Sequence, residues 1–212
     1  MAKQRKLIYE KSYKGHPINT EAERGLACDK RILDALKRTI DTGLEQSSKA
    51  LVVRYDVRFP NGMEIDDTTN QAFRAFQSTF CKRLSRQGLK PKYVAVREHD
   101  TSTNPHYHVA LVLDGQKTKS AYKHLEHAEA TLAYQLGLEQ DKNHGLIHSC
   151  RESKDGQPQT NTYMLSRSSN EEYDKAFHRL SYLAKVATKP ADGVRELFVS
   201  KRSKKGERHE HQ

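Results

Sequence analysis

Several features that would assign a chain to a common protein class are missing from this sequence. Its three cysteines, Cys28, Cys81 and Cys150, are widely spaced and form no Cys-x-x-Cys pair, and there is no tryptophan. This pattern suggests neither a disulfide framework nor a structural zinc finger, and a reducing cytoplasm is the expected compartment. No run of 18 apolar residues is present, so we expect no membrane span. No apolar segment follows the basic N-terminus, so we expect no secretory signal.

The sequence also lacks the Gly-x-x-x-x-Gly-Lys-Ser/Thr pattern of nucleotide-hydrolysing motors, and it has no internal repeat. What it has in excess is positive charge. Its 37 lysines and arginines exceed its 27 aspartates and glutamates, which gives a formal net charge of +10. This excess favours an anionic partner, nucleic acid before membrane.

Strand-like runs alternate along the chain with amphipathic helical patterns. The strands are predicted at residues 50–59, 93–98 and 106–113, and the helices at residues 26–42, 67–87, 119–137 and 171–187. This order predicts an α+β fold with a central antiparallel sheet and flanking helices. A short run that ends at Ile147 is a candidate fourth strand. Residues 151–170 are polar and predict a long loop.

The length of 212 residues suits one domain with tails. We expect residues 1–45 to form a basic N-terminal arm and helix, and residues 46–200 to form the main domain. Residues 201–212 are expected to be a basic, disordered tail.

The strand at residues 50–59 has apolar side chains on one face and charged ones on the other. Arg54, Asp56 and Arg58 alternate with apolar residues, which is typical of a half-buried strand. Its charged face is either solvated or a basic floor for a nucleic-acid strand. The sequence alone leaves both interpretations open.

Two histidines begin the strand at residues 106–113. Side chains alternate faces along a strand, so His106 and His108 project from the same face and can share one metal ion. Glu98, which ends the preceding strand, can supply an oxygen ligand, and His99 and Asp100 are alternatives to it. The competing interpretation is a pair of ordinary surface or core histidines. A secondary candidate ligand is His148.

The helix predicted at residues 171–187 places one tyrosine off its apolar stripe. At about 100° per residue, Tyr182 lies about 200° around the helix from Leu180. His178 and Lys185 share its polar face. A tyrosine that only filled the core would lie on the stripe. The alternative is an exposed tyrosine beside solvated charges.

Together these two elements resemble the HUH endonucleases, the rolling-circle replication initiators, relaxases and related transposases. The resemblance rests on His106-Tyr107-His108 followed by Tyr182-Leu183-Ala184-Lys185. A narrower resemblance, to replication proteins of inovirus-type filamentous phages, rests on Val96-Arg97-Glu98-His99-Asp100-Thr101-Ser102, Asn104-Pro105-His106-Tyr107-His108 and the Ser181 to Lys185 segment. It covers roughly residues 45–200. The family fold is ferredoxin-like or RNA-recognition-like, with the histidine strand central and the tyrosine helix across the same face.

The resemblance implies a specific chemistry. Tyr182 would be the nucleophile that forms a 5′-phosphotyrosine, and Lys185 would stabilise the developing charge. Mg²⁺ or Mn²⁺ would be bound by His106, His108 and Glu98. The DNA-binding residues expected are Arg54, Arg58 and Arg97.

The implied function is site-specific nicking and joining of single-stranded DNA, which initiates rolling-circle replication of a phage or plasmid-like replicon in a bacterial cytoplasm. The expected partners are single-stranded or hairpin origin DNA and a host helicase, polymerase and single-strand-binding protein, without a membrane. Two alternatives remain. One is a transposase or mobilisation relaxase with the same chemistry, and the other is a noncatalytic DNA-binding regulator on the same fold.

Overall fold

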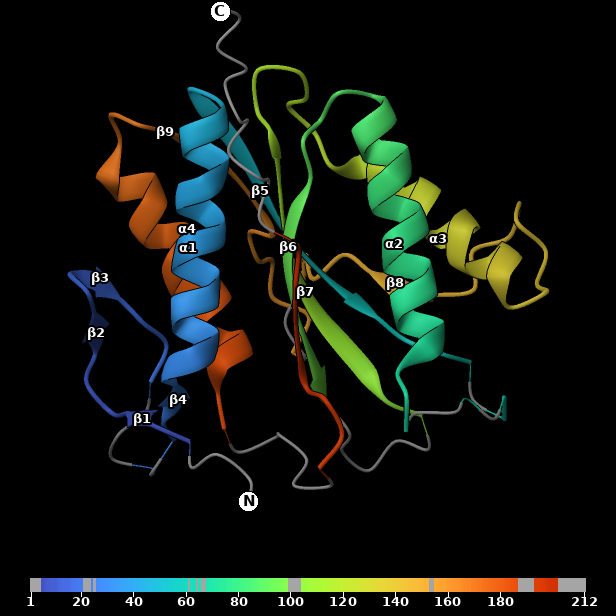
Figure 1. The fold of residues 1–212 in the computed structure, drawn as a ribbon, viewed down its shortest axis with the longest axis horizontal. Helices are drawn as coiled ribbons and strands as arrows, with labels where there is room; N and C mark the ends of the chain where they lie inside the picture. Colours follow the sequence, from blue (N-terminus) through green and yellow to red (C-terminus); the bar gives the residue numbers. More distant parts are fainter. Residues whose placement is uncertain are drawn as a thin grey trace, which may run out of the picture.

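The computed structural model describes residues 5–20, 24, 26–60, 62–63, 65, 68–98, 104–152, 155–186 and 193–201. These residues form an α+β fold with a large antiparallel sheet between two layers of helices, as the sequence predicts (Figure 1). The sheet contains β5 (Lys49–Val57), β6 (Lys92–Glu98), β7 (His106–Asp114), β8 (Ile147–His148), β9 (Thr162–Ser166) and β10 (Leu197–Val199). Its strand order is β10-β6-β7-β5-β8, and β9 also pairs with β5. The histidine strand β7 is therefore central.

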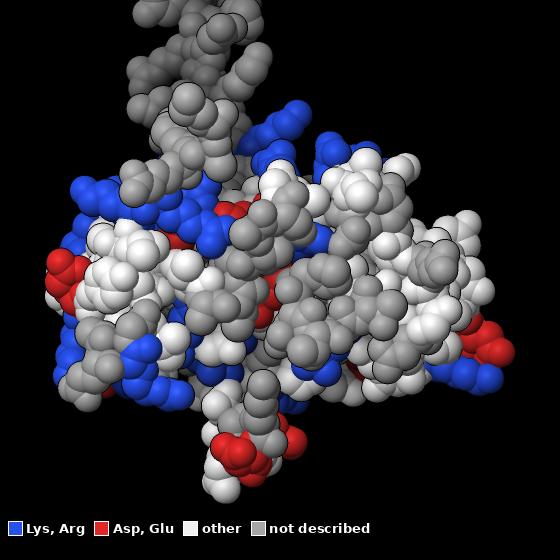
Figure 2. Space-filling view, turned by 90° about the horizontal axis from the view of Figure 1, so that it is seen from below, with Lys and Arg blue, Asp and Glu red and all other residues white. Residues whose placement is uncertain are grey.

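At the lower end of the sheet in Figure 1, β6 ends and β7 begins. Figure 2 views the molecule from this end. Lysine and arginine side chains gather mainly along the left and upper edges of this view, and acidic side chains appear near its middle and at its left, right and lower edges.

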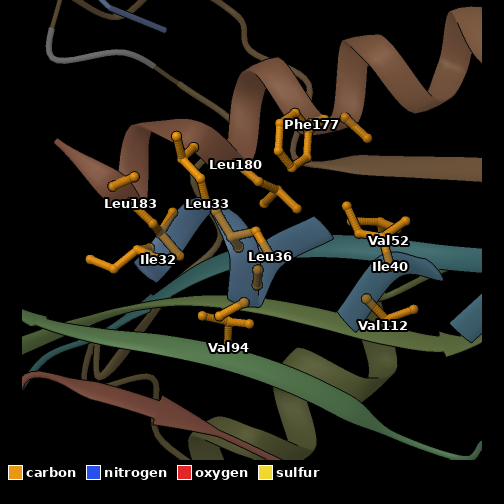
Figure 3. Packing of buried hydrophobic residues seen from close by; sticks show 14 of the residues in the cluster. Ile32, Leu33, Leu36, Ile40, Val52, Val94, Val112, Phe177, Leu180 and Leu183 are labelled. Atoms are coloured by element: carbon orange, nitrogen blue, oxygen red, sulfur yellow. The ribbon is translucent and has the colours of Figure 1, made fainter. Parts of the chain in front are cut away.

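One face of the sheet is covered by α1 (Lys30–Gln46) and α4 (Asn170–Ser181) (Figure 1). The α1 helix is capped at its N-terminus by Asp29, whose carboxylate accepts a hydrogen bond from the Arg31 backbone N–H at 2.8 Å. Its apolar stripe packs against α4 and against the strands (Figure 3). The packed side chains are Ile32, Leu33, Leu36, Ile40, Val52, Val94, Val112, Phe177, Leu180 and Leu183. Because α1 belongs to the same core as the sheet, the predicted division at residue 45 separates no independent core, although the boundary itself stays a prediction.

The opposite face is covered by α2 (Gln71–Arg86) and α3 (Tyr122–Gln135). The α2 stripe is aromatic, and the Phe73 ring stacks on the Tyr107 ring of β7 with centroids 3.9 Å apart. With helices on both faces, β5 is buried on both. The predicted half-buried strand is therefore wrong, since Arg54 and Asp56 are only 6% and 5% exposed.

Several element predictions need correction. The predicted loop at residues 151–170 contains β9, and β10 was not predicted. The helix predicted to reach residue 187 ends at Ser181, and Tyr182 begins a 3-10 turn, η2 (Tyr182–Ala184). The N-terminal segment adds two small pairings, β1 (Leu7–Ile8) with β4 (Cys28–Asp29) and β2 (Ser12–Tyr13) with β3 (His16–Pro17).

The predicted tail lies outside the described residues except for residue 201. Among the described residues, no helix combines the length and the apolar character needed to cross a membrane.

Candidate active site

A row of polar side chains crosses the sheet beneath the α1 and α4 layer. The register places His108 of β7 opposite Asp56 of β5, and Asp56 opposite His148 of β8. Directly opposed side chains on one face have Cβ atoms about 4.5–5.5 Å apart. In the neighbouring position, Glu98 of β6 is opposite His106. Strand alternation and register alone therefore bring three histidines and two carboxylates together.

Glu98, His106 and His108 offer three ligand atoms to a metal ion, all within 4.8 Å of one another. Glu98 Oε2 lies 2.8 Å from His108 Nε2 and 3.4 Å from His106 Nε2. Ligands about 2.1 Å from an octahedral ion at right angles are about 3.0 Å apart, so these separations suit a divalent cation. Glu98 and His108 are buried, and the His106 side chain is 24% exposed, which leaves an open approach.

Asp56 lies against the other nitrogen of His108. Its Oδ1 is 2.6 Å from His108 Nδ1, so both ring nitrogens face a carboxylate. Burial opposes charge on His108, but hydrogen bonds to Asp56 and Glu98 outweigh it and raise the pKa of the imidazole. The proton on Nε2 then lies between the two atoms that would share a metal ion. Asp56 would fix the tautomer of a metal-bound His108, as carboxylates do behind many ligating histidines.

Tyr182 lies beside this metal-ligand group. Its ring centroid is 5.9 Å from that of His108, and the two rings are perpendicular. Cζ of Arg54 lies 4.6 Å from the Tyr182 ring centroid, and Nζ of Lys185 lies 5.1 Å from it. Burial and the nearby Glu98 raise the pKa of the Tyr182 hydroxyl, while the Arg54 charge works in the opposite direction.

A second guanidinium lies near Arg54. Burial, and then the Arg54 charge, lower the pKa of Arg179, which means that two cations are held close together. Arg179 donates a hydrogen bond to the Cys150 carbonyl at 3.4 Å. Within the described part of the chain, the buried Nε atoms of both arginines lack a hydrogen-bond partner. Paired cations with unused donors suit a phosphate group.

The N-terminal segment holds the turn that contains Tyr182. Cys28 and Lys185 form an isolated antiparallel bridge, and the Val186 N–H donates to the Ala27 carbonyl at 3.1 Å. The Asn19 N–H donates to the Ser181 hydroxyl at 2.7 Å. Residues before position 45 therefore shape this site.

The predicted site residues are not all brought together. Arg97 is 1% exposed and is paired with Tyr107, so it points to the α2 face. The guanidinium of Arg97 is therefore not at the surface of this structure, and its DNA-binding role stays a prediction. Arg58 is exposed, just beyond the end of β5. His99 and Asp100 lie outside the described residues, so the choice of Glu98 over them stays a prediction.

His178 is exposed on α4, and Tyr182 makes its ring contact with His108. The helix expected to carry the shared polar face stops before Tyr182, but Lys185 still lies against the Tyr182 ring. Asp56 and Arg179 were not assigned to the site from the sequence. The signal for Asp56 was present as a charged residue alternating with apolar ones on β5, but its pairing with His108 depends on register.

The family model described as the YagK/YfjJ C-terminal domain matches residues 9–199, so the chain belongs to this family. No curated protein matches the chain. Among solved structures, the chain is similar to the catalytic domain of the adeno-associated virus type 5 Rep protein, with a TM-score of 0.35 and 12% sequence identity. The match covers 64% of this chain and 96% of that one.

Proposed function

We propose that this member of the YagK/YfjJ C-terminal domain family is a metal-dependent endonuclease of the HUH type, which nicks and rejoins single-stranded DNA. The observation that supports this most directly is the contact between Tyr182 and His108. It places a potential nucleophile 5.9 Å, ring centre to ring centre, from a ligand of the candidate metal group. The ligands come from adjacent strands and the tyrosine from the turn after α4.

Glu98, His106 and His108 would hold Mg²⁺ or Mn²⁺, which supplies Lewis-acid polarisation of the phosphate oxygens. Asp56 keeps the His108 ring in place through its hydrogen bond to Nδ1. The Glu98 carboxylate favours a hard divalent ion over a soft one.

Tyr182 attacks the phosphorus, and the bond between phosphorus and the 3′-oxygen breaks. The hydroxyl loses its proton, the leaving oxygen gains one, and a 5′-phosphotyrosine remains with a free 3′-hydroxyl. Arg54 and Lys185, which lie against the ring, stabilise negative charge on the tyrosine oxygen. Because the covalent link conserves the phosphodiester bond energy, reversal of the step rejoins DNA ends.

The substrate of this proposal is single-stranded or hairpin origin DNA, and the role is initiation of rolling-circle replication, as in inovirus-type phages. Basic side chains around the site-bearing end of the molecule supply salt-dependent affinity for the DNA backbone (Figure 2). The sequence has no nucleotide-hydrolysing motif of its own. The pathway therefore needs a host helicase, polymerase and single-strand-binding protein in a bacterial cytoplasm.

A gel assay for a covalent adduct tests this function. Single-stranded origin oligonucleotides labelled at the 5′ or the 3′ end are incubated with protein and Mn²⁺, with and without a chelator. We expect a slowly migrating adduct on the 3′-side fragment only, absent with chelator and with Tyr182→Phe. Tyr134→Phe is the matched control, because Tyr134 is 70% exposed on α3 and should leave the adduct unchanged.

Binding without an adduct across a broad set of oligonucleotides would favour the noncatalytic regulator. An adduct that survives in Tyr182→Phe would identify another nucleophile. Mapping the cut to a replication origin, a transfer origin or an element end separates replication from mobilisation and transposition.

A further inference from the structure

A second group of potential metal ligands lies on the far side of Asp56 from His108. It consists of Asp56 of β5, His148 of β8 and Cys150 just after β8. One ligand atom from each lies within 4.8 Å of the others. Unlike the group around Glu98, it includes a thiol, and thiol ligands favour zinc over magnesium or manganese.

The sulfur-to-nitrogen separation in this group matches that around a tetrahedral ion, and the nitrogen-to-oxygen separation is wider. With Zn–S of about 2.3 Å and Zn–N of about 2.05 Å, tetrahedral sulfur and nitrogen ligands are about 3.6 Å apart. Cys150 Sγ lies 3.6 Å from His148 Nδ1. The corresponding nitrogen-to-oxygen separation is about 3.3 Å, and His148 Nδ1 lies 3.8 Å from Asp56 Oδ2. A small rotation of the half-exposed His148 side chain, which moves Nδ1 toward Asp56 Oδ2, would bring this separation to the tetrahedral value.

The two ligand groups are distinct although they meet at one carboxylate. His108 turns Nε2 toward Glu98 and Nδ1 toward Asp56, so its ring separates the two groups. Asp56 likewise divides its oxygens, with Oδ1 against His108 and Oδ2 toward His148. An ion in the second group would therefore use an oxygen that the first group does not need.

The backbone builds the second group at some conformational cost. Asp56 and His148 are direct partners in the β5–β8 register. Cys150 has a positive φ of 54°, a left-handed conformation that few non-glycine residues adopt. Hydrogen bonds fix this turn, because Arg179 donates to the Cys150 carbonyl and the Asn161 amide donates to the Ser149 carbonyl. Conformations of this kind persist where surrounding contacts determine them, and they concentrate at functional sites.

We infer that Asp56, His148 and Cys150 bind a second divalent cation of the zinc class, with a fourth position open to water. On binding, the S–H bond of Cys150 breaks, a sulfur–metal bond forms and the proton passes to solvent, so one proton is released per ion. The buried thiol and carboxylate come from the interior, and His148, with a 41% exposed side chain, faces solvent on the entry side.

Occupation of this site has a consequence for the first one. An ion on Oδ2 fixes the orientation of Asp56 and, through Oδ1, the ring of His108. It also joins the turn after β8 to β5. The second ion is therefore a structural support for the metal-ligand group of the active site. The inference itself does not depend on nuclease activity.

Cobalt substitution distinguishes the two sites, since a thiolate bound to Co²⁺ gives a charge-transfer absorption in the near ultraviolet that oxygen and imidazole ligands do not give. The full chain is titrated with Co²⁺ and then with Zn²⁺. We expect the sulfur band in the wild type and in the double variant His106→Ala/His108→Ala, and its disappearance as Zn²⁺ displaces Co²⁺. Cys150→Ser should abolish the band. Cys81→Ser, at a cysteine on α2, is the control that keeps it.

His148→Gln provides a second test that leaves the thiol in place, and it should weaken the band or remove it. Circular dichroism and thermal unfolding establish that each variant is folded before titration. The proposal is overturned if folded wild type shows no sulfur band, or if the band survives in Cys150→Ser. It is also overturned if the band is lost in the double variant while that protein remains folded, because the sulfur ligand would then belong to the first site.

Discussion

The two faces of the sheet are built from the same strands, yet the polar side chains of the candidate site lie on only one of them. On the α2 and α3 face, aromatic rings fill the layer as far as the start of β7, where Tyr107 stacks on Phe73. On the α1 and α4 face, aliphatic packing gives way at that end to the polar row of His108, Asp56 and His148. The α4 helix stops at Ser181, and Tyr182 follows it as the first residue of η2.

This difference arises because successive side chains of one strand point to opposite faces of the sheet. His106 and His108 flank Tyr107 in the sequence. The two histidines lie on the α1 and α4 face, and Tyr107 lies in the core on the α2 and α3 face. The same alternation sends Glu98 to the metal-ligand group and its neighbour Arg97 into the α2 layer. A one-residue change in register would exchange these roles, so both faces must pack correctly for the ligands to meet.

The largest expected effect comes from removing a buried aromatic ring from the α2 and α3 face of the sheet. Phe76→Ala removes a ring that is fully buried and stacked with Phe80, and it should lower the free energy of unfolding by about 3–5 kcal/mol. Metal affinity of the remaining folded protein should stay unchanged. Urea unfolding and Mn²⁺ titration at low temperature measure the two quantities. A fall in affinity of fully folded protein would show that the faces are coupled.

On the site face, Asp56→Asn should weaken metal binding by about 10- to 100-fold, because His108 loses the carboxylate behind its Nδ1. Isothermal titration with Mn²⁺ measures the change. Asp34→Asn is the matched control, since Asp34 pairs with Lys14 and Lys30 away from the row. Equal affinities for the two variants would contradict the role of Asp56.

The raised pKa of His108 predicts how metal binding depends on pH. In the metal-free protein, the stability contributed by charged His108 is fully present below its unfolded pKa of about 6.5 and is lost as pH rises through the raised folded value. A metal ion requires the neutral ring and competes with that proton. The increase in Tm caused by Mn²⁺ should therefore grow from pH 6 to pH 8. A constant or shrinking increase would rule out His108 as a ligand.

The smallest expected effects distinguish Arg58 from Arg97. Arg58→Ala should weaken single-stranded DNA binding and reduce the slope of log affinity against log salt by about one, with stability unchanged. Arg97→Met should lower stability and leave DNA binding and the salt slope unchanged, because Arg97 is buried on the α2 and α3 face of the sheet. Fluorescence anisotropy over a range of salt concentrations, with thermal unfolding beside it, tests both. A salt slope altered by Arg97→Met would support its predicted contact with DNA.

The local patterns were enough to predict the elements that form from residues near in sequence. Strands β5, β6 and β7 and the four α-helices were predicted, with ends shifted by a few residues. The strand β9 was missed because its segment is short and follows Gly156 and Pro158, and it exists only by pairing with β5. Alternation predicted the grouping of His106 and His108 with Glu98. It could not reveal that Asp56 lies opposite His108, because register between distant strands is set by the whole sheet.

The bridge between Cys28 and Lys185 has a consequence for the order in which the site is assembled. A chain emerges from the ribosome N-terminus first, and contacts between distant residues form only after both segments exist. Strands β5, β6 and β7, with Glu98, His106 and His108, are all synthesised long before Tyr182. Cys28 must then wait for its partner in the last part of the chain. The turn that contains Tyr182 can therefore be fixed against the N-terminal segment only after the strands that carry Glu98, His106 and His108 have been synthesised.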